Sequence, residues 1–359
     1  MDEAIAAHAH DVVTCRELGD RHGEGLGLIN LGVALQRLRR FDEAIAALTE
    51  AGEIFRGLSD RHGEGLALNS CGWGLQRLRR FDEAIAAHTQ AREIFRELRD
   101  LYGEGRALTS LGAALEQVRR FDEAISAHTQ AGEVFRRLRD RYGEGHALTN
   151  LGVALADVRR FDEAISAHTQ AHEIFRELGD RHGQGGALTN LGGALPEALR
   201  FDEAIVALTQ AADIFCEFRD RHGEGQALNN LGLAFAHKGR FYYAIDIDNL
   251  AGEIFRELGD RHGQGNALTN LGVALAQVRR FHDAITALTQ ARKIFREVGD
   301  RHGEGHALYN LGLVFRAARR FGKARAAGAR AADLFAETGD LHWARIARSR
   351  LRELPFWSR

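Results

Sequence analysis

Proline and cysteine are scarce in this sequence, and long apolar runs are absent from it. The 359 residues include two prolines and three cysteines. With so few helix breakers and with abundant Ala, Leu, Glu and Arg, the composition favours helices over a sheet. Cys15, Cys71 and Cys216 lack the spacing of a metal site, and small apolar residues suit their positions. We therefore expect buried thiols in a reducing compartment.

Charge of one sign is also lacking. The formal net charge is −2, so the chain has no overall basic field of the kind that attracts nucleic acid, and we do not expect nucleic acid as its partner. No run of about 18 apolar residues predicts a membrane span, and residues 1–4 lack the features of a secretory signal. We expect a cytoplasmic protein without a membrane span. Hydrophobic residues make up 45% of the chain, which is enough for a continuous core.

One unit repeats along the chain with a period of 40 residues. The run Phe-Asp-Glu-Ala-Ile at residues 41–45 returns at Phe81, Phe121, Phe161 and Phe201, and in altered form at Phe241, Phe281 and Phe321. A fixed period of about 20 to 50 residues is typical of a solenoid, in which each unit buries its apolar face against its neighbours.

Each unit contains two predicted helices. Leu148, Leu151 and Leu155 recur at steps of three and four residues, which indicates the apolar face of a first helix, helix A. Residues 161–178 show the same period and predict helix B. Gly179 suits a left-handed helix end, and Asp180 suits the cap of the following helix A.

A glycine recurs inside helix A of every unit. Because a glycine within a helix costs about 0.5–1 kcal/mol relative to alanine, we expect these positions to allow close helix packing. They are Gly32, Gly72, Gly112, Gly152, Gly192, Gly232, Gly272 and Gly312.

The pattern Leu148-x-x-Leu151-Gly152-x-x-Leu155, followed by Ala164 and Ala171, resembles the tetratricopeptide repeat (TPR). The unit is longer than the usual repeat and lacks its closing proline. In both respects it is similar to the repeats of Partner-of-Inscuteable-type adaptors and of actinobacterial TPR regulators. The resemblance implies an all-α fold, a right-handed superhelical solenoid of antiparallel helix pairs.

We expect a single TPR solenoid over residues 1–359. It comprises an unpaired first helix at 1–18, eight 40-residue helix pairs at 19–338, and a basic capping helix and tail at 339–359. Pro196 removes a backbone donor near the end of its helix and should kink the last turn. Unusual residues follow one unit later, so we expect a bend or a loosened interface between Pro196 and Asn249.

No catalytic, metal or cofactor site is expected. A Gly-x-Gly occurs in every unit, as at Gly143 and Gly145, but without a nucleotide-binding fingerprint. Histidines that share a repeat position lie one unit apart, too far to bind one metal ion. The Asp-Glu pairs that open helix B in most units suit the helix dipole. We therefore expect a protein that is not an enzyme.

The resemblance implies a concave groove lined by helix A, with a recurrent asparagine that can hydrogen-bond the backbone of a ligand. By position these residues are Asn30, Asn150, Asn190, Asn230, Asn270 and Asn310, and Ser70 and Ser110 interrupt the row. The most variable helix A position faces the same groove and includes Arg106, His146, Gln226, Asn266 and His306. Two alternatives remain open, a local bond from each asparagine to a neighbouring helix and neutral variation on a solvent-exposed face.

The expected function is a scaffold or adaptor that binds a protein or peptide in this groove. One alternative is the sensor or regulatory arm of a larger signalling NTPase or transcriptional regulator. Another is a structural solenoid that associates with itself through exposed repeat ends. From residue 316 onward the chain has 11 Lys or Arg against 4 Asp or Glu. This stretch suits a solvated cap, with an acidic partner, an anionic membrane surface or nucleic acid as the alternatives.

Overall fold

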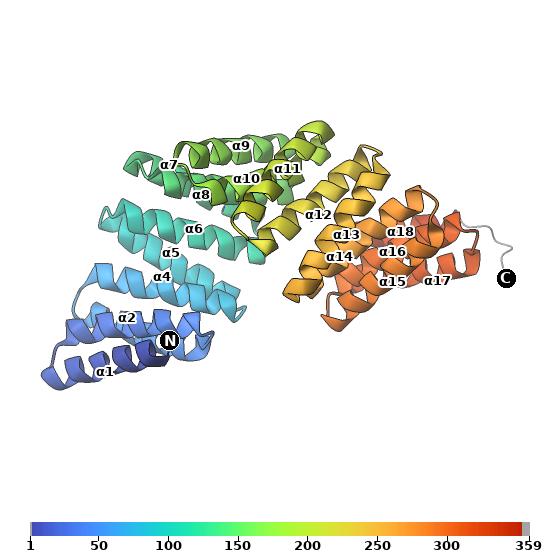
Figure 1. The fold of residues 1–359 in the computed structure, drawn as a ribbon. Coiled ribbons are helices and arrows are strands. Elements are labelled where there is room, and N and C mark those ends of the chain that lie inside the picture. The colour runs from blue at the N-terminus through green and yellow to red at the C-terminus, as the bar shows by residue number, and fades with distance from the viewer. Residues whose placement is uncertain (1, 354–359) are drawn as a thin grey trace. The chain divides into compact units, whose positions relative to one another are not determined.

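The computed structural model describes residues 2–353, which form helices joined by short turns, without a strand in that range (Figure 1). Two compact units are present, Met1–Gly179 (unit 1) and Asp180–Arg359 (unit 2). Each is a stack of antiparallel helix pairs, so the predicted fold class, an all-α TPR-like solenoid, is confirmed. That residues 1–359 form a single domain stays a prediction.

Unit 1 consists of an unpaired helix followed by four helix pairs. Its helices are α1 (Asp2–Leu18), α2 (Arg21–Arg37), α3 (Phe41–Gly57), α4 (Arg61–Arg77), α5 (Phe81–Glu97), α6 (Leu101–Gln117), α7 (Phe121–Leu138), α8 (Arg141–Asp157) and α9 (Phe161–Glu177).

Unit 2 consists of four helix pairs followed by a last helix. Its elements are α10 (Arg181–Ala194), the short 3₁₀ helix η1 (Leu195–Ala198), α11 (Phe201–Glu217), α12 (Arg221–His237), α13 (Phe241–Leu258), α14 (Arg261–Gln277), α15 (Phe281–Glu297), α16 (Arg301–Ala317), α17 (Phe321–Glu337) and α18 (Leu341–Arg352).

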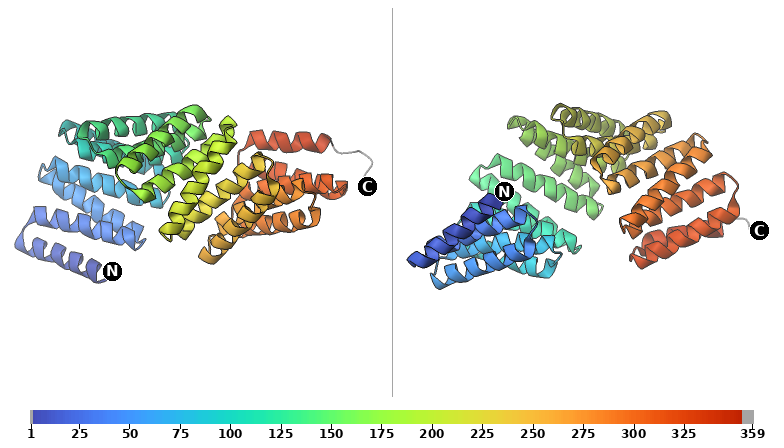
Figure 2. Two further views of the ribbon diagram at one scale, coloured as in Figure 1. Left: turned by 45° about the horizontal axis from the view of Figure 1, so that its top comes forward. Right: turned by 60° about the horizontal axis from the view of Figure 1, so that its bottom comes forward.

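The helices of each unit form two layers, an A layer of even-numbered helices and a B layer of odd-numbered helices, as Figure 2 shows from two sides. Neighbouring A helices contact each other directly, α2 with α4 or α12 with α14, for example. No comparable contact joins neighbouring B helices within residues 2–353. Because the A helices lie closer together, the A layer forms the concave side of each unit.

The repeated Gly-x-Gly is explained by phenylalanine packing. A Cβ added at Gly143 would lie 2.5 Å from the ring of Phe135, and one added at Gly145 would lie 3.0 Å from Phe175. The start of α8 is thus held between the rings of α7 and α9, with no room for a side chain at either glycine. The motif serves packing and provides no phosphate-binding loop.

The glycine inside helix A packs against the eighth residue of the paired helix B. A Cβ at Gly152 would lie 2.4 Å from the ring of His168, and one at Gly272 would lie 2.5 Å from Leu288. The predicted close helix approach is therefore confirmed at these positions. The eighth residue is leucine or histidine in most units, but it is Asp248 in α13.

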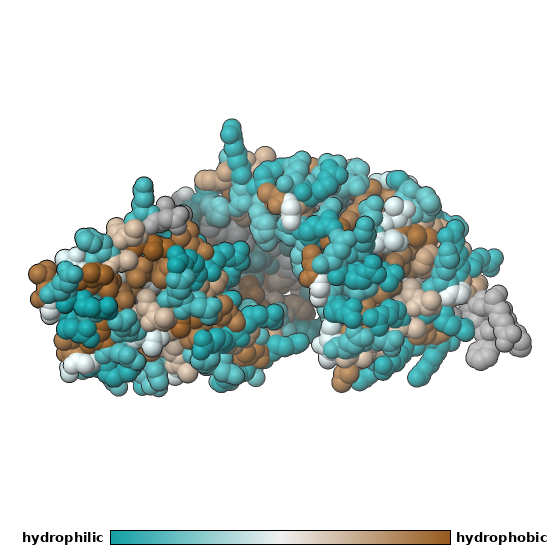
Figure 3. Space-filling view, turned by 90° about the horizontal axis from the view of Figure 1, so that it is seen from below, coloured by the Kyte–Doolittle hydropathy of each residue, from teal (hydrophilic) through white to brown (hydrophobic). Residues whose placement is uncertain are grey.

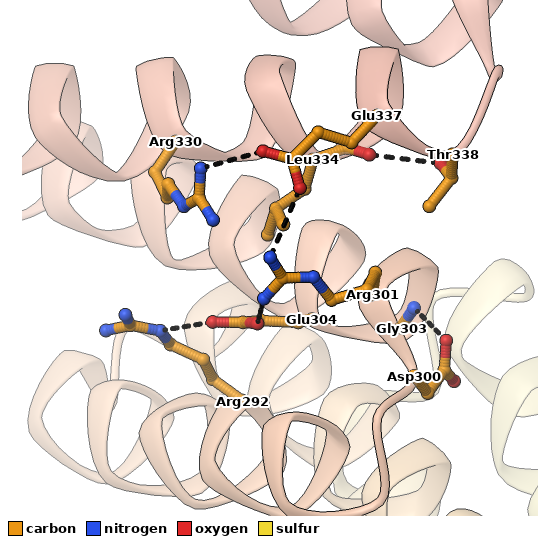
Figure 4. A network of polar contacts seen from close by, with 9 residues as sticks. All are labelled: Arg292, Asp300, Arg301, Gly303, Glu304, Arg330, Leu334, Glu337 and Thr338. Atoms are coloured by element: carbon orange, nitrogen blue, oxygen red, sulfur yellow. Dashed lines mark hydrogen bonds and ion pairs between the residues drawn. The ribbon is translucent and has the colours of Figure 1, made fainter.

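A polar network joins the helix pairs at the start of helix A. The buried Glu144 accepts hydrogen bonds from Arg136 at 2.8 Å and Arg141 at 2.7 Å, and Arg141 also donates to the exposed Glu177 at 2.6 Å. Figure 4 draws the related network around Glu304, in which Arg292 takes the role that Arg136 has at Glu144. The sequence analysis did not foresee this network, whose buried acids are Glu24, Glu64, Glu144, Glu224 and Glu304.

Successive repeats are also joined by histidine–aspartate pairs. In each pair a His Nε2 lies 3.0–3.5 Å from the Oδ2 of the aspartate that caps the next helix A within the same unit. Asp220 accepts a hydrogen bond from the backbone N–H of Gly223 and a second from His182, and these contacts lower its pKa. The pairs are His22–Asp60, His62–Asp100, His182–Asp220, His222–Asp260, His262–Asp300 and His302–Asp340.

The predicted helix ends are confirmed where a glycine stands. Gly179 has a φ of +70°, and the side chain of Asp180 accepts from the N–H of Gly183. Other turns place arginine in the same left-handed conformation, for example Arg139 with a φ of 58°.

Pro196 has the effect expected on its own helix. The α-helix ends at Ala194, and the last turn becomes η1. Of the two expected alternatives, a bend or a loosened interface, the bend is present, while α12 and α13 contact each other as extensively as any pair in the described range.

Two further expectations concern the cysteines and the C-terminal cap. Cys71 is buried, but Cys15 is half-buried and Cys216 is exposed, so the prediction of three buried thiols is wrong. The cap helix α18 buries Ala344 and Ala347 and exposes several arginines, while the predicted tail from residue 354 lies outside the described residues.

Candidate functional site

The candidate groove residues all belong to helices of the A layer. Asn30, Arg106, His146 and Gln226 are exposed, and the other seven predicted residues are half-buried. Their repeat positions therefore reach solvent in both units. The hollows that they line lie within one unit each and are described separately.

The first hollow in unit 2, the amide pocket, lies over α10, α12 and α14. It has a volume of about 280 Å³. The predicted residues Asn190, Gln226, Asn230 and Asn266 line it together with Asn229. Five side-chain amides thus face one cavity, and each amide offers both a hydrogen-bond donor and an acceptor.

A second hollow in unit 2 continues toward α16 and α18. Its volume is about 690 Å³, and Asn266 belongs to both hollows. The predicted residues Asn270, His306 and Asn310 line it as well. Its apolar wall is formed by Leu233, Val273 and Trp343. The pocket combines polar groups with an apolar surface, as peptide-binding clefts do.

Several of these amides have no partner within the protein. Asn190, Gln226, Asn230 and Asn310 make no hydrogen bond through their side chains to any other residue in the described range. Asn270 differs, because it donates to Asn229 on the neighbouring helix at 3.2 Å. The open alternative of a local bond therefore holds for Asn270 but not for these four residues.

His306 stands in an aromatic environment at the end of the groove. Its ring lies 4.9 Å from Phe335 and 4.8 Å from Trp343, measured between centroids. Burial, with a smaller contribution from His302, lowers the pKa of His306 to about 4. The imidazole is therefore neutral at pH 7 and offers a hydrogen bond without a charge.

Unit 1 gathers fewer of the predicted residues. Arg106 lines a hollow of about 340 Å³ with Ser70 and Ser110, the two residues that interrupt the asparagine row. His146 packs edge-on against Tyr142, with centroids 4.5 Å apart. Asn30, His146 and Asn150 lie on the A layer outside the hollows described here.

Sequence reasoning missed several residues that line these hollows, among them Asn229, Arg37 and Trp343. Asn229 occupies a repeat position that is threonine in four other units, and this departure was the available signal. Arg37 lies at the last position of α2, which the repeat pattern did not single out. Trp343 comes from the capping helix, whose contact with the groove no repeat pattern indicates.

Metal-binding clusters and membrane-spanning helices are absent from the described part of the chain. No cluster of three or more His, Cys, Asp or Glu residues suited to a metal ion occurs in residues 2–353. In the same range, none of the helices has the length and apolar character that crossing a membrane requires. The face drawn in Figure 3 is mostly hydrophilic, with hydrophobic residues scattered over it.

Comparison with solved structures places the fold among repeat proteins. A Rap protein complexed with competence and sporulation factor is 15% identical, with a TM-score of 0.58 over 92% of this chain and 97% of that one. BtubC from P. vanneervenii is 21% identical, with a TM-score of 0.56 over 61% and 92%. A signal transduction ATPase with a tetratricopeptide repeat sensor from Pyrococcus horikoshii is 13% identical, with a TM-score of 0.58 over 93% and 53%.

A comparison with curated protein sequences finds no match. The family model for the tetratricopeptide repeat, however, matches overlapping stretches that cover most of the chain. These are residues 23–97, 66–137, 103–177, 143–217, 223–297 and 264–337. The chain belongs to the tetratricopeptide repeat family.

Proposed function

We propose that the chain is a non-enzymatic scaffold or adaptor that binds an extended peptide or protein segment on the A layer of unit 2. The observation that carries this proposal is the row of unpartnered side-chain amides, Asn190, Gln226, Asn230 and Asn310. A peptide in extended form has backbone N–H and C=O groups that amides of this kind can bind.

The spacing of the repeats suits an extended ligand. Adjacent packed helices lie about 8–10 Å apart, and an extended chain rises about 3.3 Å per residue. Amides from successive repeats therefore address ligand residues about three positions apart. Leu233, Val273 and Trp343 then supply apolar contacts between these polar ones. Affinity comes from the ligand backbone, and selectivity comes from its side chains.

The test is capture of a partner from lysate, with identification by mass spectrometry. The altered chain carries Asn190→Ala, Asn230→Ala and Asn310→Ala. A matched control carries Gln210→Ala, Asn249→Ala and Gln290→Ala, which removes three exposed amides from the B layer of the same unit. Circular dichroism checks that both variants keep their helicity.

The groove proposal requires a partner that the native chain and the control both retain and that the altered chain loses. A synthetic peptide from that partner should then bind the native chain directly in calorimetry. Equal capture by all three chains would show that the amides do not bind the partner, and the proposal would fail.

A second candidate function is a regulatory arm. The similarity to the ATPase with a tetratricopeptide repeat sensor covers 93% of this chain but 53% of that protein. This relation favours a TPR segment that works beside another domain. The size of the native polypeptide on an immunoblot decides between them, because a band near 39.7 kDa argues for the free adaptor and a much larger one for the arm.

A further inference from the structure

An exposed indole in unit 1 lies in a pocket that arginines also line. Trp73 of α4 is 43% exposed and lines the 340 Å³ hollow described above, which we name the Trp73 pocket. Arg37 and Arg106 line the same pocket from α2 and α6. The guanidinium of Arg77 lies 6.0 Å from the centroid of the Trp73 ring. One arginine therefore lies close to the indole ring, and two more line the pocket that the indole lines.

These arginines lack the acidic partners that other arginines of the chain have. Arg61 pairs with Glu64 and Glu97, but Arg37, Arg77 and Arg106 form no ion pair with any carboxylate in residues 2–353. Arg77 and Arg106 rest only on aromatic rings, and the residues that line the pocket include no acid. The pocket thus presents positive charge that the protein itself leaves uncompensated.

Two neutral polar side chains of the pocket, Gln36 and Asn69, are already engaged. The Gln36 side chain donates to the backbone carbonyl of Ser70 at 2.7 Å. The side-chain oxygen Oδ1 of Asn69 lies 2.7 Å from Nδ1 of His88. In contrast to the amide pocket of unit 2, this site therefore offers few free amides to a ligand. What it offers is guanidinium groups beside an indole face.

The charge changes sign along the A layer of unit 1. The repeat position of Arg37 and Arg77 is occupied by Gln117 and then by Asp157 in the following helices. A ligand lying across this layer therefore meets the arginines of α2, α4 and α6 and then the negative charge of Glu116 at the end of α6 and of Asp157 on α8. This gradient favours one orientation of an asymmetrically charged segment.

We propose that the Trp73 pocket binds acidic side chains of an extended peptide, which identifies an acidic segment as the partner of unit 1. The inference rests on the proposed peptide-binding function and extends it to a second site. Guanidinium groups bind carboxylates through paired, charge-assisted hydrogen bonds, and the indole packs against the apolar part of the same segment.

The probe is a fluorescein-labelled peptide of about ten residues that alternates Glu with Ser, long enough to cross three repeats. Its control has Gln in place of every Glu. Fluorescence anisotropy with the full chain should show binding of the acidic peptide, weaker binding at high salt, and no binding of the neutral one.

The altered chain carries Arg37→Gln and Arg106→Gln. Gln117 occupies the repeat position of Arg37, and Gln226 occupies that of Arg106, so the fold accepts glutamine at both. The control is Arg137→Glu on the B layer, which changes the net charge by the same amount and matches Glu97 and Glu177 at its own position. We expect the altered chain to bind the acidic peptide at least about tenfold more weakly, and the control to bind it within about twofold of the native chain.

Equal weakening by both variants would mean that net charge alone attracts the peptide, and the proposal would fail. Absence of binding to the native chain would also overturn it. Trp73→Val, which installs the residue found at Val33, should weaken binding while leaving the arginines in place. The unit 2 amide variant decides the proposed function separately, because a partner lost only by that variant upholds the scaffold proposal even when the acidic peptide fails to bind.

Discussion

Asp248 is the residue whose environment differs most from that of its counterparts. Its side chain is 1% exposed, and neither carboxylate oxygen has a hydrogen-bond partner among the described residues. A Cβ at Gly232 of α12 would lie 1.9 Å from its Oδ1. Burial raises the pKa of Asp248 to about 8, so the side chain is mostly protonated at pH 7. The position is leucine at Leu48, Leu208 and Leu288.

We predict that Asp248→Leu stabilises the protein at pH 7. Because the pKa of Asp248 is raised in the folded state, its protonation contributes to stability. This contribution is complete below the pKa of the unfolded state, about 3.8, and is lost as the pH rises toward 8. At pH 7 the contribution that has been lost corresponds to about three pKa units. Because leucine does not ionise, the substitution should raise the free energy of unfolding by about 4 kcal/mol. Urea unfolding at pH 5, 7 and 8 measures this, and the gain should grow with pH.

The exposed neighbour Asp246 provides the control for this prediction. Asp246→Leu makes the same substitution two residues away, but it removes a solvated carboxylate, so stability should change by less than about 1 kcal/mol at each pH. A pH-independent gain for Asp248→Leu would show that the buried carboxyl does not titrate across this range.

At the scale of the helix, the internal glycines are a direct test of packing. Gly152→Ala places a methyl group 2.4 Å from the ring of His168, which is buried, so the ring or the helix must shift. We expect a loss of about 2 kcal/mol in the free energy of unfolding, despite the better helix propensity of alanine.

Gly186 is the matched control, because it lies in α10 with no atom within 4 Å of its added Cβ. Gly186→Ala should stabilise the protein by about 0.5–1 kcal/mol. Thermal unfolding of the two variants must therefore shift in opposite directions. Stabilisation by both substitutions would mean that the helices do not approach as closely as the structure shows.

The buried glutamates link one helix pair to the next. We predict that Glu144→Gln lowers the free energy of unfolding by about 1–2 kcal/mol, because it removes a charge that two arginines bind. Gln184 occupies the same repeat position, so the substitution fits the site. Glu177→Gln, which alters the exposed partner of Arg141, should cost less than about 0.5 kcal/mol in the same chemical unfolding experiment. Equal losses would indicate that burial adds nothing to the pair at Glu144.

The helices were predictable because the same pattern of apolar residues recurs in every repeat. The period of 40 residues, the apolar faces and the asparagine positions lead to the two layers and to the amide pocket. Contacts between repeats were not predictable, since no local pattern places Arg136 against Glu144 or Asn270 against Asn229. The exposure of Cys216 was missed for the same reason, because burial depends on which helix lies opposite.

At the scale of the whole molecule, the two units carry different titratable groups in their cores. Unit 1 contains His88 and His168, and burial lowers the pKa of each to about 4. Unit 2 contains Asp248, with a pKa of about 8, and His306, with a pKa of about 4. The units should therefore respond differently to pH.

We predict that unit 1 loses stability in acid while unit 2 changes less. A lowered histidine pKa gives stability that is complete above the unfolded value of about 6.5 and is lost as the pH falls toward 4, at about 3 kcal/mol for each of His88 and His168. In unit 2 the loss from His306 is opposed by Asp248, whose contribution grows as the pH falls. Above pH 6.5 unit 2 should lose more stability than unit 1. In this range only Asp248 still holds a proton in the folded state that it lacks in the unfolded state.

Hydrogen exchange with mass spectrometry separates the units, because peptides from α5 and from α13 report on each. After correction for the intrinsic exchange rate, protection in α5 should fall between pH 6.5 and 4.5, and protection in α13 should fall between pH 6.5 and 8. The variant His88→Leu with His168→Leu should remove the acid response of α5 alone. Parallel loss in both helices at either extreme would mean that the pH dependence comes from charges spread over the surface, because the buried groups named here lie in one unit or the other.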